Sequence, residues 1–94
     1  MPYVLVQHKV KDYEKWRPLF DEHGATRKAS GSKGGMVFRN AKHKNEVAIL
    51  LEWDNLANAR KFYASEDLKK VMEEAGVSGK PDISFLKRAS RARD

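Results

Sequence analysis

The stretch Tyr3–Val10, YVLVQHKV, decides the fold class of this chain. Successive side chains of a β-strand point to opposite faces, so Val4, Val6 and His8 share one face and Leu5 lies on the other. Both faces are apolar at the start of the stretch, which is typical of a strand that is covered on both sides. A sheet with helices on one face only would leave an apolar face bare. The stretch therefore indicates that a second subunit covers that face.

The segment Glu46–Trp53, EVAILLEW, repeats this two-sided pattern. Ile49 belongs to one apolar face and Leu50 to the other, in the middle of the expected strand. Met36–Arg39 predicts a shorter strand before it, and the polar residues between the two suit the turn of an antiparallel hairpin. Pro81–Leu86 predicts the last strand.

Asp12 is a suitable N-cap for a helix that runs to about His23 and ends at Gly24. Pro18 inside it lacks the N–H that would bond the carbonyl of Glu14, so we expect a kink or a loose first turn. The Gly- and Ser-rich segment that follows predicts a mobile loop. This loop carries a basic cluster of Arg27, Lys28 and Lys33.

A second helical region follows the hairpin in two pieces. Asp54 or Asn55 caps the first piece, and Ser65 caps the second, which stops at Gly76. The order of elements predicts an α+β protein with the ferredoxin-like β-α-β-β-α-β fold, in which a four-stranded antiparallel sheet has both helices on one face. Its other face would expose more apolar surface than a monomer usually tolerates. We therefore predict a homodimer whose sheets pair face to face.

A length of 94 residues allows one domain. We expect this domain to comprise residues 1–86. Residues 87–94 form a basic C-terminal tail that cannot pack a core and is expected to be flexible. Four cations in this tail account for much of the formal net charge of +6: Lys87, Arg88, Arg91 and Arg93, with Asp94 as the last residue.

Composition removes several classes of protein. The absence of cysteine excludes disulfides, thiol nucleophiles and thiolate metal sites. No histidines stand at metal-ligand spacing, so we expect no metal. The longest apolar run, Val47–Leu51, is too short to span a membrane and no signal peptide is evident, so the expected location is cytoplasmic. Nucleic acid is not the expected partner, because Glu46–Trp53 has aliphatic residues and glutamates where an RNA-recognition module needs stacking aromatics.

The chain resembles the dimeric α+β barrel superfamily and, within it, the antibiotic biosynthesis monooxygenase-like group. The resemblance implies a sheet-paired dimer with a small pocket in each subunit, between helices and sheet. Members of the group include cofactor-independent oxygenases of polycyclic phenols and quinols, polyketide cyclases, small-molecule isomerases and haem-degrading enzymes. The features that carry it are Val4–Val10 running into Asp12–Trp16, Phe20–His23, Met36–Asn40 followed by Glu46–Trp53, and the helix split at Ser65.

One departure from this group concerns haem. Relatives in the haem-degrading and quinol-oxygenase branches often carry a histidine in the second helix, shortly before a Ser or Thr. The matching place here is near Phe62, three residues before Ser65, and the region holds no histidine. Because this histidine is missing, the comparison with the group implies that the chain does not bind haem, and we expect no cofactor.

Three residues are candidates for chemistry: His8, His23 and Arg39. A histidine near pH 7 can take or deliver a proton, as cyclisation, isomerisation or phenol activation requires. His8 shares a strand face with Val4 and Val6, so it approaches the same internal cavity as His23 if that face meets the helices. Arg39 can hold an enolate, phenolate or carboxylate. The alternatives are two packing histidines and an exposed arginine at the sheet edge.

Aromatic side chains can build the apolar walls of a pocket, and Trp and Tyr add donors that orient a bound oxygen. Aromatics at such spacings are more often simple core. The candidate substrate-binding residues are Tyr13, Trp16, Phe20, Trp53, Phe62 and Tyr63.

These residues and the resemblance together predict a small-molecule enzyme. We expect a cofactor-independent oxygenase, or a cyclase or isomerase, that acts on a hydrophobic aromatic or enolic metabolite by histidine-assisted proton transfer. The alternative is a non-catalytic ligand-binding or stress-related dimer whose pocket is filled by its own side chains. A cavity too small for a ring would favour this alternative.

Overall fold

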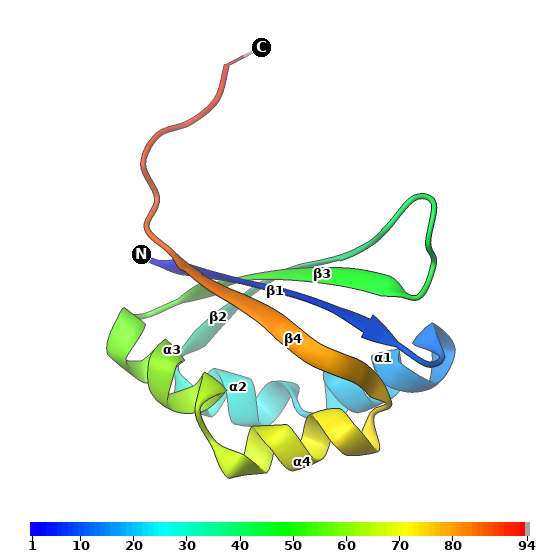
Figure 1. The fold of residues 1–94 in the computed structure, drawn as a ribbon. Helices are drawn as coiled ribbons and strands as arrows, with labels where there is room; N and C mark the ends of the chain where they lie inside the picture. The colour runs from blue at the N-terminus through cyan, green and yellow to red at the C-terminus, as the bar shows by residue number, and fades with distance from the viewer. Residues whose placement is uncertain (94) are drawn as a thin grey trace.

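The computed structural model describes residues 1–93, and within them four strands form one antiparallel sheet in the order β2-β3-β1-β4. The predicted ferredoxin-like α+β fold is confirmed, with the helices gathered on one face of the sheet (Figure 1). The strands are β1 (Tyr3–Val10), β2 (Ser32–Arg39), β3 (Glu46–Trp53) and β4 (Val77–Leu86). The helices are α1 (Tyr13–Glu22), α2 (Gly24–Ser30), α3 (Leu56–Tyr63) and α4 (Glu66–Glu74).

The hydrophobic core lies between the helices and one face of the sheet. Alternate residues of β1 and β3 are buried there, and Val4, Val6 and Trp53 are almost entirely inaccessible to solvent. In the register of the sheet, Val6 stands between Ile49 on one side and Ile83 on the other. The face that carries His8 therefore meets the helices, which was the condition for a shared histidine cavity.

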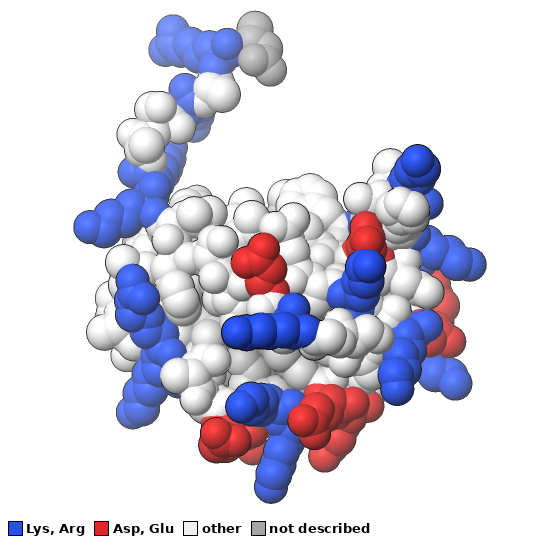
Figure 2. All heavy atoms as spheres, in the orientation of Figure 1, with Lys and Arg blue, Asp and Glu red and all other residues white. Residues whose placement is uncertain are grey.

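The opposite face of the sheet is uncovered, and we call it the open face. One row across it reads Met36, Leu50, Leu5 and Ser84 from β2 to β4. Met36 is 60% exposed, and Phe38 in the next row is 46% exposed. Figure 2 shows a mostly uncharged surface there, between the basic tail and the β2–β3 turn. The sequence pattern that indicated a two-sided apolar sheet is therefore present in the fold.

Helix ends follow the predicted caps. The side chain of Asp12 accepts a hydrogen bond from the backbone of Glu14, and that of Ser65 accepts one from Leu68. Of the two candidates for the α3 cap, Asn55 is the N-cap residue. These side chains satisfy backbone N–H groups that the first turn of a helix leaves without partners. The helix α1 continues through Pro18 to Glu22.

The segment after α1 corrects one expectation. The prediction of a loop from Gly24 to Gly35 is wrong, because this segment contains helix α2 and the first half of β2. Ala25, Arg27, Lys28 and Ala29 favour a helix, and Gly31 ends it with a φ of 122°. In β2, Gly35 passes so close to β3 that a side chain there would collide with the backbone carbonyl of Leu50. At Gly35, therefore, glycine marks a close approach of two strands and not a loop.

The last strand begins earlier than predicted, at Val77 instead of Pro81. Gln7 of β1 pairs with Asp82, whereas Lys9 pairs with Ser78, so β4 bulges opposite His8. The bulge contains Gly79, whose φ of 70° few other residues adopt.

The basic tail leaves the end of β4 and projects away from the sheet (Figures 1 and 2). Residues 87–93 are exposed and have no helix or strand, and Asp94 lies outside the described residues. The division into residues 1–86 and a flexible tail stays a prediction. No helix among the described residues is long and apolar enough to cross a membrane.

Candidate functional site

The helices and the covered face of the sheet enclose a cavity of about 50 Å³, which we call the inner cavity. It is much smaller than the roughly 150 Å³ in which an apolar protein cavity holds benzene. Strands β1 and β3 provide its floor, and all four helices contribute to its walls. The residues that line it are Val6, His8, Trp16, Phe20, His23, Arg27, Ile49, Leu51, Phe62, Tyr63, Leu68, Val71, Met72 and Ala75.

His8 reaches the inner cavity from β1. It is 8% exposed, and its ring meets that of Trp16 edge to face, with 5.7 Å between centroids. The Nδ1 atom is buried without a hydrogen-bond partner among residues 1–93. Burial is the main cause that lowers the pKa of His8 below its ordinary value of 6.5. The imidazole is therefore neutral at pH 7 and has an available nitrogen.

His23 reaches the same cavity from the junction of α1 and α2. Its ring lies 5.8 Å from that of Phe62, and its Nε2 atom is also buried without a partner in the described part of the chain. Burial and the nearby charge of Arg27 lower the pKa of His23, and Asp67 acts in the opposite direction. The sequence thus placed two histidines at one cavity, and the structure brings both there.

Arg27 lines the inner cavity as well, and the sequence reasoning missed it. Its guanidinium lies 3.7 Å above the ring of Phe20 and donates from Nη1 to the backbone oxygen of Phe20 at 2.7 Å. Burial is the main cause that lowers the pKa of Arg27 below its ordinary value, although the group stays charged at neutral pH. The sequence signal that could have identified Arg27 is its spacing from His23: residues four apart lie on the same face of a helix.

Aromatic residues from two helices wall this cavity. Trp16 and Phe20 stack at 5.0 Å on α1, while Phe62 and Tyr63 meet edge to face at 5.1 Å on α3. Burial raises the pKa of the Tyr63 hydroxyl to about 12, so it stays protonated and can act as a donor. These four candidate wall residues come together as the helical spacing indicated.

Three other sequence candidates lie outside the inner cavity. Trp53 is fully buried and packs on Phe62 as part of the core. Tyr13 lies at the outer end of the aromatic row of α1, where the guanidinium of Arg39 covers its ring at 3.9 Å. Arg39 also donates from Nε to the backbone oxygen of Lys44 and pairs with Glu14 at 3.8 Å. These partners hold Arg39 at the sheet edge, where it lines a hollow of the open face together with His8 but does not line the inner cavity.

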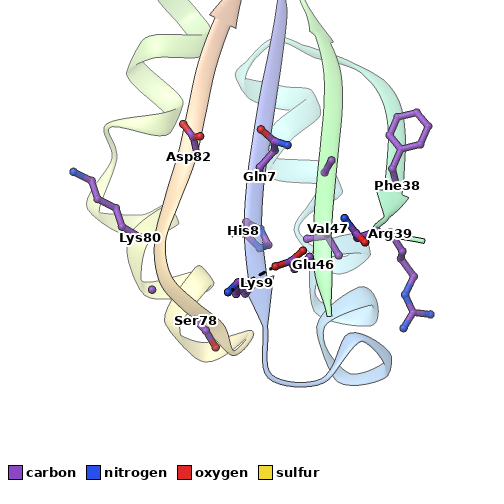
Figure 3. A pocket seen from close by; sticks show the side chains of 13 residues that line it. Gln7, His8, Lys9, Phe38, Arg39, Glu46, Val47, Ser78, Lys80 and Asp82 are labelled. Carbon is purple, nitrogen blue, oxygen red and sulfur yellow. Dashed lines mark ion pairs between the residues drawn. The ribbon is translucent and has the colours of Figure 1, made fainter. Parts of the chain in front are cut away.

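A wider hollow of about 590 Å³ lies on the open face, beside the β4 bulge (Figure 3). Polar side chains of β1, β3 and β4 line it, including Gln7, Asp82 and an ion pair of Lys9 with Glu46 at 3.7 Å. It lacks the convergence of buried, unpaired groups that the inner cavity has. We therefore take the inner cavity as the candidate site. Within residues 1–93, no cluster of His, Asp or Glu could hold a metal ion.

The fold belongs to a known structural class: an α+β protein in which helices cover one side of a four-stranded antiparallel sheet, here with a small cavity between the two layers. The antibiotic biosynthesis monooxygenase domain has this fold, so the resemblance inferred from the sequence is confirmed for the fold. No protein-family profile and no curated protein sequence matches the chain.

Solved structures supply the comparison. A crystal structure of an antibiotic biosynthesis monooxygenase superposes with a TM-score of 0.71 at 18% identity, over 96% of this chain and 100% of that one. A protein of Bordetella bronchiseptica, described as a candidate member of the same class, gives 0.78 at 10% identity over 95% and 97%. SnoaB of Streptomyces nogalater, a cofactor-independent oxygenase, gives 0.77 at 10% identity over 99% and 97%. At these identities the similarity shows the fold alone.

Proposed function

We propose that this chain is a small-molecule enzyme that moves a proton on an aromatic or enolic compound without a cofactor, as an oxygenase or as a cyclase or isomerase. The observation that carries the proposal is the convergence of His8, His23 and Arg27 on one cavity. His8 Nδ1 and His23 Nε2 are buried there without hydrogen-bond partners among residues 1–93, and a bound polar group that bonds them would remove an unfavourable contribution to the folded state. The similarity of the fold to that of SnoaB, a cofactor-independent oxygenase, supports the same proposal.

The chemistry follows from the protonation states of these groups. A neutral imidazole of His8 or His23 accepts a proton from a phenolic O–H or an acidic C–H, and the electron pair stays on the substrate as a phenolate or enolate. The fixed positive charge of Arg27 stabilises this anion. In a cyclase or isomerase the proton returns elsewhere on the substrate. In an oxygenase the anion adds O₂ and a proton to give a hydroperoxide, which loses water: one oxygen atom stays as a new carbonyl group, and the substrate carbon supplies the two hydrogens and the electrons.

The size of the inner cavity favours a second candidate function. About 50 Å³ does not admit an aromatic ring, and a pocket filled by its own side chains is what a non-catalytic dimer would have. The enzyme proposal therefore requires that only a small part of the substrate, such as its hydroxyl group, enters this space. A ligand-binding or stress-related protein remains the alternative.

The proposal includes a homodimer that covers the open face. Leu5, Leu50, Met36 and Phe38 form a contiguous apolar region there, and exposed regions of this kind mark interaction surfaces. A second copy of the same sheet offers a surface of matching composition. Pairing of the two sheets would remove these side chains from water.

Anthrone tests the enzyme proposal, because a base converts it into an enolate that O₂ oxidises. We expect the wild type to consume O₂ and to accelerate formation of the quinone. His8→Gln and His23→Gln should lower this rate by about a hundredfold or more, which is the usual contribution of a positioned base. His43→Gln is the matched control, because His43 is exposed in the β2–β3 turn. Circular dichroism checks that each variant is folded.

Three outcomes separate the candidates. Loss of turnover in the His8 or His23 variant, but not in the His43 control, supports the enzyme. Unchanged turnover in both cavity variants refutes the proposed base. A change in Trp fluorescence on adding anthrone, with no oxygen consumed by any variant, supports a binding protein.

A further inference from the structure

A basic groove of about 780 Å³ lies between α1, α2 and the edge strand β2. No Asp or Glu lines this groove. Of its cations, Arg17 is neutralised by Asp21, whose Oδ1 lies 2.9 Å from the Arg17 Nε. Arg27, Lys28 and Lys33 form no ion pair among residues 1–93. The groove therefore presents three uncompensated positive charges, which attract an anion.

The groove borders the inner cavity. Phe20, Arg27 and Leu51 line both spaces. The guanidinium of Arg27 thus lies at the boundary, where one of its five N–H donors bonds the Phe20 backbone and the others remain for a ligand. Because Arg27 and His23 line the same inner cavity, a group held by Arg27 at this boundary faces the space that the imidazole lines.

Gly34 leaves the groove open on the side of β2. Gly34 and Gly35 of β2 contribute no side chain to its lining. A Cβ at Gly34 would meet no atom within 4 Å, so space is open above that residue. The volume falls in the range of pockets that hold drug-sized ligands, roughly 300–1,000 Å³, whereas the inner cavity is far below it. A ring that the inner cavity rejects fits in this groove.

We infer that the groove binds the carboxylate and the ring of the substrate whose hydroxyl or enol end enters the inner cavity. The substrate class is then an aromatic or enolic acid. Arg27 and the two lysines hold the carboxylate, and the ring lies near Phe20. This inference rests on the proposed function, and it explains how a site with so small an inner cavity can serve a molecule with a ring.

The probe is 3-hydroxy-2-naphthoate, and the neutral 3-hydroxy-2-naphthamide has the same ring and hydroxyl without the charge. Binding is followed in ¹⁵N-labelled protein through the amide signals of Gly34 and Gly35. We expect the acid to bind at least about tenfold more tightly than the amide, with the difference shrinking at high salt.

Variants of the groove test which side chains hold the carboxylate of the probe. Lys28→Ala combined with Lys33→Ala should weaken binding of the acid about fivefold and leave binding of the amide unchanged. The control combines Lys61→Ala with Lys70→Ala, which removes two exposed helical lysines that do not line the groove. Arg27→Lys keeps the charge but loses the planar fork, and we expect it to weaken the acid further.

Two results would overturn the inference: equal affinity for acid and amide, or equal affinity of the groove variant and its control. Inorganic phosphate serves as a second probe in the same titration. If phosphate shifts the glycine signals and the naphthoate neither binds nor competes, the groove takes a free oxyanion and its link to the inner cavity is refuted. Charge-dependent binding without histidine-dependent turnover would refute the enzyme and leave the groove assignment standing.

Discussion

The two faces of the sheet have similar apolar side chains along β1 and β3 but opposite surroundings. On β3, Ile49 is 4% exposed under the helices, while its neighbour Leu50 lies on the open face. The buried face is sealed by helices that the same chain supplies. The open face has an apolar row and no covering element among residues 1–93. The alternation of apolar residues in the strands identifies the sheet faces that must be buried. The apolar faces of the helices identify which of these two sheet faces the chain buries with its own residues.

The largest expected effect comes from the neighbouring pair Ile49 and Leu50. Ile49→Ala should lower the free energy of unfolding by about 2–5 kcal/mol, because it leaves a cavity in a packed core. Leu50→Ala should lower it by about 1 kcal/mol at protein concentrations where the chain is monomeric. Urea unfolding of both variants measures the contrast. Equal losses at high dilution would contradict the distinction between the two faces.

The next effect tests the open face directly. Leu50→Asp places an unpaired carboxylate in the proposed dimer interface and should raise the dimer dissociation constant by about a hundredfold or more. Ala57→Asp, at an exposed position of α3, adds the same charge on the helix side and should leave the dimer intact. Sedimentation velocity at micromolar concentration reports both. A wild-type chain that sediments as a monomer would remove the dimer altogether.

A smaller effect concerns pH and the covered face. Because burial lowers the pKa values of His8 and His23 in the folded state, the unfolded chain binds more protons as the pH falls through 6.5. Stability should therefore decrease from pH 7.5 to 5.5, by at most about 1.4 kcal/mol per pH unit for each histidine. His8→Gln should reduce this slope and His43→Gln should not. Urea midpoints across this range give the slopes, and a stability that rises on acidification would contradict the buried neutral state.

Much of the fold was predictable because its signals are local. Alternation along Glu46–Trp53 fixed the strand, and Ser65 marked the break between α3 and α4. The segment from Gly24 to Gly35 was mispredicted because Gly31 ends a helix against Asp54 and Gly35 lies in a strand, so that neither glycine marks a loop. The position of Gly35 depends on the approach of the β3 backbone, which no local pattern encodes.

The candidate site was predictable in part for the same reason. Periodicity predicted a cavity shared by His8 and His23 only if the His8 face of the sheet met the helices, and the packing of the helices met this condition. Arg27 was missed because it follows Gly24, where the expected helix ended. The position of Arg39 outside the inner cavity accompanies its contacts with Tyr13 and Glu14, which form only once α1 packs beside the sheet edge.

The bulge in β4 has a consequence for how copies of this chain can meet. β4 is a border of the sheet, and an additional strand would need an uninterrupted row of free amide donors along it. Gly79 distorts that row, Lys80 adds a charge, and Pro81 has no N–H to offer. Growth by strand addition is therefore hindered along this border, so that further copies of the chain would have to approach at the β2 edge or at the open face.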